Sequence, residues 1–444
     1  MNSTQTGTYG ARRPYTRSSG AGTQSTAGGS RNSGAPSKRT LSQKRAPSVT
    51  NRGAAPHAVG TPRREYVSRG VAPTPRTPKE TLRIIPIGGC EEVGRNMVLF
   101  EYEDDIVLVD MGLQFPEEDM PGIDYIIPNI KYLQGKEKNV RGVVFTHGHL
   151  DHIGAAPFLL EKLSFPPIVA RDLTIALIKH KQEDYQKGSA KKLKIIRVNS
   201  LDDKVKLGKM TISFFQVEHS IMDAMGVCVE TPAGTAIHPG DWTMERDKEG
   251  NTRLRYDQLA STKTRPTALL LESLGAVSNN RHGTYEEMYE NLYGIIAKAT
   301  GRVIIGTFSS QVERVKWVIY AAAKLGKKVA LDGYSMKMNV EIAKELGYIT
   351  IPKGTLIDVK DIESYPDNNV VVICTGAQGE DNAVLMRIVN KTHRFLSLRT
   401  NDTVVFSSSI IPGNERTIQR LKDNIYRQCD NVIHGDIMDV HISG

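Results

Sequence analysis

Four potential metal ligands lie close together in the segment "VFTHGHLDHIG", residues 144–154. They are His147, His149, Asp151 and His152, and they follow an apolar run that predicts a buried strand. Imidazole nitrogens and carboxylate oxygens are the ligands that zinc takes when thiolates are absent. A lone histidine pair is more often structural, but four such groups at a strand end indicate a metal-binding loop.

One tight loop is too cramped to surround a metal, so we expect further ligands from other strand ends. His219 in "QVEHSIMD" and Asp241 in "AIHPGDW" both follow predicted strands. Asp110 in "VLVDMG" is either a residue that orients the metal loop by hydrogen bonds or an ordinary turn residue. We interpret His238 as a structural or supporting residue rather than as a ligand.

The region from Leu82 to Asp241 is rich in predicted strands, and the polar residues named above stand where these strands end. Strands are expected in "LRIIPIGG", "IVLVDMG" and "RGVVFTHGH", a helix over 151–163, and hairpins in "VKLGKMTISFFQVEHS" and "GVCVETPAGTAIHPGD". From Thr267 onward, strand patterns alternate with helix patterns, as in "GRVIIGTFS" followed by "QVERVKWVIYAAAKLG". This alternation predicts a second α/β domain with a parallel sheet and crossover helices.

The positive charge of the chain is concentrated at its N-terminal end. Residues 1–80 contain 14 Lys and Arg against 2 Asp and Glu, a net charge of +12, whereas the whole chain carries +9 and residues 81–444 carry −3. A tail so rich in Ser, Gly, Pro and Arg cannot bury enough apolar surface to fold. We expect it to be disordered and either to contact RNA or ribosomes or to act only as a solubilising extension.

The sequence predicts a cytoplasmic protein that does not contact the membrane. No run of eighteen apolar residues predicts a transmembrane helix, and the N-terminus lacks the apolar core of a secretion signal. The cysteines form no CxxC pair, so the sequence supports neither a disulfide framework nor a cysteine-based zinc site. They are scattered along the chain at Cys90, Cys228, Cys374 and Cys429.

"THGHLDHIG" resembles the HxHxDH signature of the metallo-β-lactamase superfamily, which specifies the superfamily and nothing narrower. Other segments, among them "GGCEEVGRNM", "VDMGLQFPEEDMPGIDYIIPN", "EHSIMDAMG", "DGYSM", "TGAQGE" and "FSSSIIPGNE", resemble the ribonuclease J family in the β-CASP branch of that superfamily. The resemblance implies an α/β fold, a metallo-β-lactamase αββα sandwich with an inserted β-CASP α/β domain. The expected regions are the tail (1–80), the metallo-β-lactamase domain (81–272), the β-CASP domain (273–436) and the start of a return to the first domain (437–444).

The resemblance also implies a site with two Zn²⁺ ions, for which Mn²⁺ or Mg²⁺ are alternatives. The implied ligands are His147, His149 and His219 for the first ion, Asp151 and His152 for the second, and Asp241 between them. Asp110 would orient the histidine loop, and Asp151, Asp241 and Glu272 would be the catalytic residues. The implied reaction is hydrolysis of an RNA phosphodiester by a hydroxide shared between the metals, and its products carry a 5′-phosphate.

Two segments depart from the family pattern. After "HISG", residues 441–444, the family continues with a histidine and with segments that complete the second zinc site, so we expect a C-terminally truncated chain with weak or no activity. "LLLESLGAVSNN" stands where the family has an Asp-Ser-Thr-Asn run. There Glu272 either takes the acidic role near the site or is a solvated loop residue.

Contacts with RNA phosphates are predicted for two small polar segments. The loop "FSSSIIPGNE" contains Ser409, and the last residues of the sequence contribute His441, Ser443 and Gly444. Amides and hydroxyls in such segments can cradle a phosphate, although ordinary turn chemistry explains them equally well. We expect the partner to be single-stranded RNA with a 5′-monophosphate, and the full-length protein to be a homo-oligomer.

The function that explains most of these residues is a zinc-dependent ribonuclease, acting as a 5′–3′ exonuclease and as an endonuclease in rRNA processing and mRNA decay. One alternative is a different hydrolase of the metallo-β-lactamase fold, acting on a thioester, a lactam or a small phosphodiester. The large second domain argues against it, because small substrates do not need such an insertion. The other alternative is an inactive RNA-binding fragment, because the C-terminal site residues of the family pattern are absent.

Overall fold

The computed structural model describes residues 80–116, 120–243, 267–274, 276, 284–380, 382–411 and 413–442. Apart from Glu80, the predicted tail lies outside these residues, as do Ser443 and Gly444 of the predicted phosphate contacts. Among the described helices, none has the length and apolar character needed to span a membrane.

The first half of the described chain forms two sheets, whose strands are ordered β1-β2-β3-β4-β5-β6 and β11-β10-β9-β8-β7. The first sheet consists of β1 (Leu82–Gly88), β2 (Met97–Tyr102), β3 (Asp105–Val109), β4 (Val140–Val144), β5 (Ile168–Ala170) and β6 (Ile195–Arg197). The second consists of β7 (Lys204–Leu207), β8 (Met210–Gln216), β9 (Met225–Thr231), β10 (Gly234–His238) and β11 (Thr267–Leu269). Both predicted hairpins are confirmed, as the antiparallel pairs β7–β8 and β9–β10.

These two sheets face each other across an apolar core, and helices cover the outer face of the first sheet. Successive residues of β2 point to opposite sides, so Phe100 packs with Phe214 between the sheets while Leu99 packs with Leu159 on the helix side. The helical elements of this half are η1 (Ile130–Leu133), η2 (Glu137–Asn139), α1 (Leu150–Ile153), α2 (Ala156–Leu159), α3 (Asp172–Tyr185) and η3 (Ser189–Lys192). The predicted α/β sandwich is confirmed.

The prediction of one continuous helix over 151–163 is wrong, because this stretch contains two short helices, α1 and α2. At the break, the Ala155 N–H donates to the carbonyl of Met111 at 2.8 Å instead of continuing the helix. Pro157 then stands in the first turn of α2, where its missing N–H leaves no hydrogen bond unmade. This hydrogen bond connects the end of the metal-binding loop, residues 147–152 with the rest of α1, to the segment that follows β3.

The second half of the described chain forms an all-parallel sheet with the strand order β14-β13-β15-β12-β16-β17. Its strands are β12 (Val303–Gly306), β13 (Lys328–Asp332), β14 (Leu356–Ile357), β15 (Val370–Cys374), β16 (Thr403–Phe406) and β17 (Asn431–Ile433). The parallel sheet and its crossover helices, predicted from the alternating patterns, are confirmed. The described residues from Glu80 to Ile442 belong to one compact unit, and the limits 272/273 and 436/437 between domains stay predictions.

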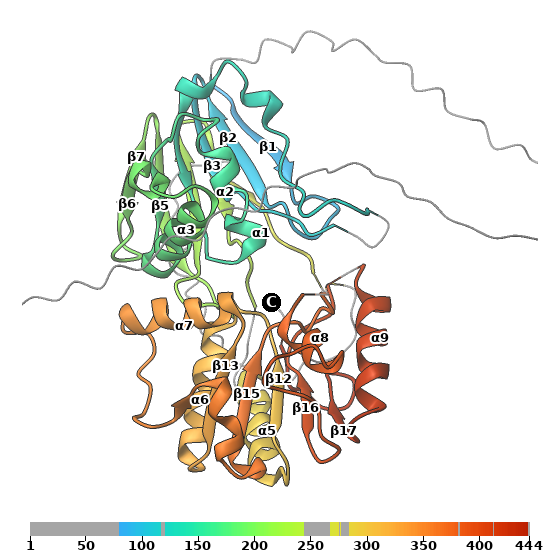
Figure 1. Cartoon of the computed structure of the whole chain (residues 1–444). Coiled ribbons are helices and arrows are strands. Elements are labelled where there is room, and N and C mark those ends of the chain that lie inside the picture. The colour runs from blue at the N-terminus through green and yellow to red at the C-terminus, as the bar shows by residue number, and fades with distance from the viewer. Residues whose placement is uncertain are drawn as a thin grey trace, which may run out of the picture. The chain divides into compact units, whose positions relative to one another are not determined.

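Helices cover both faces of the parallel sheet (Figure 1). Ile305 of β12 packs with Val315 on one face, and its neighbour Ile304 packs with Leu385 on the other. The helices of the first face are α5 (Tyr285–Lys298), α6 (Val312–Lys324) and α7 (Tyr334–Glu345), and those of the second are α8 (Val384–Val389) and α9 (Glu415–Tyr426). Two short 3-10 helices, η4 (Val359–Ser364) and η5 (Asp367–Asn369), precede β15.

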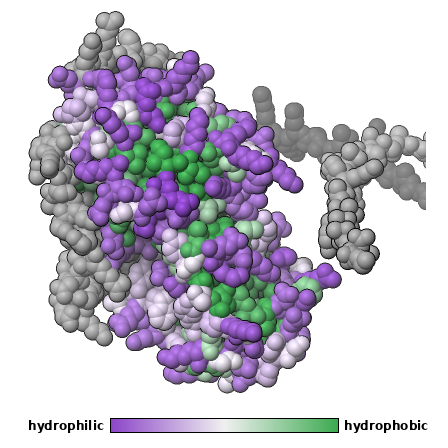
Figure 2. Space-filling view, turned by 90° about the vertical axis from the view of Figure 1, so that its left-hand side faces the viewer, coloured by the Kyte–Doolittle hydropathy of each residue, from purple (hydrophilic) through white to green (hydrophobic). Residues whose placement is uncertain are grey.

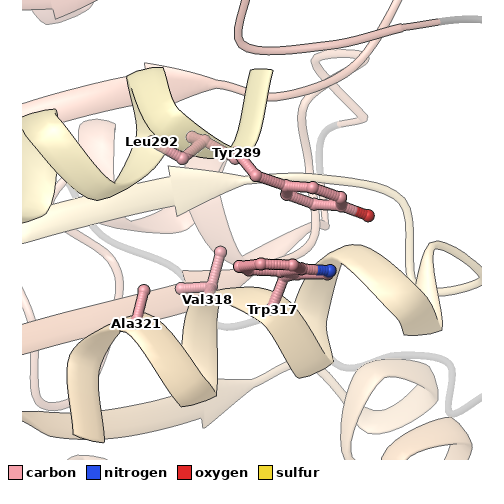
Figure 3. Close-up of a pocket in the computed structure, with 5 residues that line it drawn as sticks. All are labelled: Tyr289, Leu292, Trp317, Val318 and Ala321. Carbon is pink, nitrogen blue, oxygen red and sulfur yellow. The ribbon is translucent and has the colours of Figure 1, made fainter. Parts of the chain in front are cut away.

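Stacked aromatic rings join α5 to α6. The rings of Tyr289 and Trp317 lie 4.3 Å apart between centroids, with an angle of 14° between their planes. Figure 3 shows this pair beside Leu292, Val318 and Ala321, with which it lines a shallow pocket. Since Trp317 is 45% exposed, the pair also presents an apolar surface to solvent.

Apolar side chains are not confined to the core. Phe115, Tyr185 and Ile437 are among the large hydrophobic residues that stay more than half exposed. On the face shown in Figure 2, hydrophobic residues gather in patches that are bordered by hydrophilic residues. Patches of this kind are typical of contact surfaces, whereas single exposed apolar residues need no explanation.

Candidate metal centre

Strand ends of both sheets of the sandwich supply the side chains of the candidate centre. Asp110 directly follows β3, and His147 follows β4, which pairs with β3 in parallel. His219 and Asp241 follow β8 and β10 of the second sheet. The four strand ends bring these residues together with the α1 loop, although the first and the last of them, Asp110 and Asp241, are more than a hundred residues apart in the sequence.

The ligand atoms form two groups that share one carboxylate. The histidine group consists of His147, His149, His219 and Asp241, and the carboxylate group consists of Asp151, His152 and Asp241. Within each group, one possible ligand atom per residue lies within 4.8 Å of all the others. The structure therefore brings together all six residues that the sequence analysis named as metal ligands.

Three ring nitrogens face one another in the histidine group. His149 Nδ1 lies 3.1 Å from His147 Nε2 and 2.9 Å from His219 Nε2. Hydrogen bonds satisfy these two nitrogen pairs poorly, because each neutral imidazole has one donor and one acceptor nitrogen and His149 Nδ1 belongs to both pairs. Convergence of this kind suits a cation that accepts all three lone pairs.

The histidines of this group are held in their neutral form. Burial lowers the pKa of His147 and of His149 well below the ordinary value, and the neighbouring histidines lower both further. Burial likewise lowers the pKa of His219 to about 4, against the opposing effect of Asp241. A metal that binds here at neutral pH displaces no proton from these rings.

The carboxylate group is more open to solvent and differently charged. His152 Nε2 lies 3.2 Å from Asp241 Oδ1 and 3.5 Å from Asp151 Oδ2. The Asp151 and Asp241 side chains are 36% and 30% exposed, whereas that of His152 is 2% exposed. The carboxylates therefore form the solvent-accessible side of this group, and the His152 ring forms its buried side.

Titration in this group is governed by the pairing of His152 with carboxylates. Burial alone would lower the pKa of His152, but Asp241, Asp151 and Asp110 together raise it well above the ordinary value. Partial burial raises the pKa of Asp151 to about 6. The pKa of Asp241 is lowered, because the attraction of His152 outweighs the effect of burial. Without a metal, the protonated form of His152 is therefore favoured, in contrast to the histidines of the other group.

Asp110 joins both groups through hydrogen bonds to its carboxylate. Its Oδ1 accepts from the Thr146 N–H at 2.8 Å, and its Oδ2 accepts from Thr146 Oγ1 at 2.9 Å and from His152 Nδ1 at 2.8 Å. Thr146 Oγ1 also lies 3.0 Å from His147 Nδ1. With the Nδ1 atoms engaged in this way, the Nε2 lone pairs of His147 and His152 are aimed at the centre. Asp110 has a left-handed backbone, with φ 64°.

Asn96 is a residue of the site that the sequence analysis missed. Its Nδ2 lies 3.1 Å from His152 Nε2 and 3.4 Å from Asp151 Oδ2, and its backbone N–H donates to the Asp151 carbonyl at 3.0 Å. The Asp151 carbonyl also lies so close to Gly112 that any side chain there would overlap it. The only available signal was the position of Asn96 in "GGCEEVGRNM", because a lone amide does not reveal its partners.

Glu272 and His238 lie beside the two groups without joining them. Partial burial raises the pKa of the Glu272 carboxyl, a hydrogen bond from the Leu274 N–H opposes this shift, and the charge of Asp241 adds to it. His238 Nδ1 accepts from the Gly240 N–H at 3.0 Å, which supports the turn leading to Asp241. Glu272 is thus near enough to Asp241 for their charges to interact.

The described residues predicted to contact RNA lie in loops near the C-terminal end of the parallel sheet. The Ser409 carbonyl accepts a hydrogen bond from Gln378 Nε2 at 2.7 Å, which links the loops that follow β16 and β15. His441 Nδ1 lies within hydrogen-bond distance of Arg314 Nη1. Phosphate binding by Ser409 and His441 therefore stays a prediction.

The donor set of the centre fits divalent cations. Zinc held by three imidazoles in tetrahedral geometry would separate their nitrogens by about 3.3 Å, so shifts of a few tenths of an ångström would open the histidine group to it. The carboxylate group offers a neutral imidazole and two carboxylates once His152 has lost its proton. Two cations sharing Asp241 are therefore compatible with the residues present.

Comparisons with known proteins match both halves of the described chain. Residues 91–278 match the pattern of the metallo-β-lactamase superfamily, and residues 300–425 match that of the ribonuclease J β-CASP domain. A protein of unknown function from Enterococcus faecalis V583 has a similar fold, with a TM-score of 0.55 at 15% sequence identity over 82% of this chain and 88% of its own.

Two similar relatives are ribonucleases by name. Ribonuclease J 1 of Streptococcus pyogenes serotype M3 is 36% identical over 81% of this chain and 64% of its own length. Ribonuclease J of Thermus thermophilus is 37% identical over 83% of this chain and 65% of its own. The chain thus spans slightly less than two thirds of these relatives. Both family patterns match in sequence order, and the two relatives are 36% and 37% identical to this chain over 81% and 83% of its length. The chain therefore belongs to the ribonuclease J family of the metallo-β-lactamase superfamily.

Proposed function

We propose that this protein is a metal-dependent ribonuclease that hydrolyses RNA phosphodiesters as a 5′–3′ exonuclease and as an endonuclease, in RNA maturation and decay. The observation that carries the proposal is the pair of ligand groups that share Asp241, in a chain whose relatives are named ribonuclease J. Paired metal sites of this kind are typical of enzymes that displace a group at phosphorus.

The proposed cofactors are two Zn²⁺ ions, one held by each ligand group. Imidazole-rich sites favour zinc, while the carboxylate group also suits Mn²⁺ or Mg²⁺. When bound, such ions lower the pKa of a water molecule and stabilise negative charge on phosphate oxygens. Among the catalytic residues proposed here, Asp151 and Asp241 contribute by holding the metals.

The protein's own residues would orient the site and move protons. Asp110 keeps the Nε2 lone pairs of His147 and His152 aimed at the centre, through the hydrogen bonds of its carboxylate. Glu272 is proposed to take an acidic role near the site, because its Oε2 accepts from the Leu274 N–H and its charge interacts with that of Asp241. A carboxyl in this position can take part in proton transfer to the leaving oxygen.

The proposed substrate is single-stranded RNA with a 5′-monophosphate. Ser409, His441, Ser443 and Gly444 are proposed to contact its phosphates, and the basic residues 1–80 are proposed to attract RNA or ribosomes without regard to sequence. A homo-oligomer in the cytoplasm is the proposed setting.

The test combines metal content with hydrolysis by the 444-residue chain. Purified protein is stripped with a chelator, reloaded with Zn²⁺ or Mn²⁺, and mixed in excess with RNA that carries a 5′-monophosphate, so that slow cleavage is detected in a single turnover. Two metals per chain and metal-dependent products with 5′-phosphates are expected. A chain that binds neither metal, or cleavage that survives chelation unchanged, would refute the proposal.

A further inference from the structure

Among the described residues of the half that forms the parallel sheet, two arginines are buried, and a described carboxylate pairs with one of them. Arg302 is 1% exposed, and its Nε and Nη2 donate to the two carboxylate oxygens of Asp402 at 2.9 and 2.6 Å. Arg314 is 2% exposed, and its hydrogen bonds among the described residues go to carbonyls and to a histidine. A buried cation without a neighbouring anion is costly, and no carboxylate of the described residues pairs with Arg314, so the contrast with Arg302 calls for an explanation.

Arg314 links the end of β16 to the segment 440–442. Its Nη1 donates to the Ser407 carbonyl at 2.9 Å and contacts His441 Nδ1, while Nη2 lies 3.4 Å from the Ile442 carbonyl. Burial lowers the pKa of Arg314 to about 10, so it stays charged at neutral pH. Its guanidinium therefore holds in place the loop and the segment that are proposed to grip a phosphate.

The contact with Arg314 also determines which nitrogen of His441 carries a proton. A guanidinium has N–H donors and no acceptor, so the His441 Nδ1 that faces it must be the accepting nitrogen. The neutral ring consequently carries its proton on Nε2. A histidine in this tautomer presents a hydrogen-bond donor on the side away from Arg314, as phosphate recognition requires.

The start of the same helix contacts the loop of a metal-ligand candidate. Gln311, three residues before Arg314 and about 4.5 Å from it along the α6 axis, donates from Nε2 to Ser220 Oγ at 3.0 Å. Ser220 directly follows the metal-ligand candidate His219. Both Gln311 and Ser220 are buried, so water does not compete with this hydrogen bond.

We propose that the first turn of α6 is the element that sets the distance between the phosphate-holding segment and the metal centre. Arg314 is a positioning residue for His441 and supplies the positive charge that a substrate 5′-phosphate neutralises. Gln311 is a positioning residue for the loop of His219. The inference rests on the proposed function, and it adds that α6 aligns the 5′ end of the RNA with the bond that is cut.

The first test measures binding rather than activity. Uridine 5′-monophosphate and uridine are titrated into the 444-residue chain by calorimetry. Wild-type protein is expected to bind the monophosphate at least about tenfold tighter, as charge-assisted hydrogen bonds require. Arg314→Met should abolish this preference, and Arg314→Lys should restore part of it. Lys324→Met, which removes an exposed charge about 15 Å along the same helix, should leave it unchanged.

A preference for the monophosphate that survives in folded Arg314→Met protein would overturn the role of Arg314. If this variant fails to fold, a measurement on the wild-type protein still tests the proposal. Nitrogen NMR of histidine-labelled protein reports which ring nitrogen of His441 carries the proton. A proton on Nε2 is expected. A proton on Nδ1 would contradict the contact on which the proposal depends.

The role of Gln311 is tested by a double-mutant cycle with Ser220. Gln311→Leu and Ser220→Ala each remove the same hydrogen bond, and each is expected to lower kcat by about three- to tenfold without changing KM or the metal content. Products should also become mixed in length, because the cut is no longer aligned. The double variant should resemble either single one, and fully additive losses would overturn the link.

The two proposals fail in different ways. Wild-type protein that binds no metal and cleaves no RNA would refute the ribonuclease, whatever the behaviour of the variants. If the wild-type protein binds metal and prefers the monophosphate, and the Arg314 and Gln311 variants behave as the wild type does, the proposed ribonuclease function is retained and the inference about α6 is refuted.

Discussion

The two ligand groups of the centre come largely from one short loop and yet differ in charge and exposure. The histidine group has rings whose pKa values are lowered, so its lone pairs are available at neutral pH. The carboxylate group has a histidine whose pKa is raised and two carboxylates that are about one third exposed. A metal at the carboxylate group therefore competes with a proton on His152 more strongly than a metal at the histidine group competes with protons on its rings.

This difference arises from what each ring faces. His147 and His149 face other histidines, and their like charges would repel if they were protonated. His152 faces Asp110, Asp151 and Asp241, which favour its charged form. Neighbouring residues of one loop can thus prepare one metal site that binds readily and another that responds to pH.

Asp241→Asn should have the largest effect, because it removes the feature that the two groups share. An amide carries no charge and bridges two cations poorly, so both metals should bind weakly. RNA hydrolysis should fall by about a thousandfold, which corresponds to about 4 kcal/mol of lost charge stabilisation. Metal content by atomic absorption and single-turnover cleavage are the measurements. A variant that keeps both metals and most of its activity would show that Asp241 is not shared.

A change of pH should separate the groups. As the pH falls from 8 to 6, affinity at the carboxylate group should fall, by up to about tenfold for each pH unit for the proton on His152. The sign follows from the raised pKa values of His152 and of Asp151, about 6, since protons compete more strongly as the pH falls. The histidine group should change little until the pH nears 4, the pKa of His219. Calorimetry should show two metals per chain at pH 8 and one at pH 6, and equal losses at both groups would contradict the comparison.

Asp110→Asn should affect the carboxylate group more than the histidine group. An amide keeps one accepting oxygen, but its NH2 group would face either Thr146 or His152, which both donate to Asp110 now. Loss of an outer hydrogen-bond partner typically weakens metal binding by about 10- to 100-fold. Titration with Mn²⁺ would measure the loss at each group, and unchanged affinity at both would show that this hydrogen bonding is dispensable.

Asn96→Ala should give the smallest effect, confined to the carboxylate group. It removes one amide that contacts His152 and Asp151, and it leaves the backbone hydrogen bond to Asp151 in place. Affinity for the second metal should drop by about three- to tenfold, the range for a single hydrogen bond. Any comparable loss at the histidine group would show that Asn96 acts on the whole loop rather than on one site.

Much of the fold could be predicted because hydrophobic periodicity is a local signal. The strand and helix patterns after Thr267 anticipated the parallel sheet, and the polar residues at strand ends anticipated where the ligand atoms meet. The helix over 151–163 was predicted wrongly, because its break depends on a hydrogen bond from Ala155 to Met111 that local propensity does not contain. Tertiary contacts of this kind override propensity.

The site residues that escaped prediction act through partners distant in the sequence. Asn96 is 55 residues from Asp151, and Gln311 is 91 residues from Ser220. Amides occur on every protein surface, so their types and spacings carry no mark of such contacts. Arg314 is hidden for a related reason, because an arginine on an amphipathic helix is ordinarily solvent-exposed and here is buried.

The left-handed backbone of Asp110 has a consequence for how this protein can be stabilised. Glycine adopts this conformation without steric cost, whereas another residue is strained there, by an amount on the order of 1 kcal/mol. Asp110→Gly would therefore relax the backbone while removing the carboxylate on which both ligand groups depend. The relaxed backbone would not compensate for this loss, because the buried donors of Thr146 and His152 would be left without an acceptor. The hydrogen bonds that orient the metal centre therefore also exclude glycine from this position.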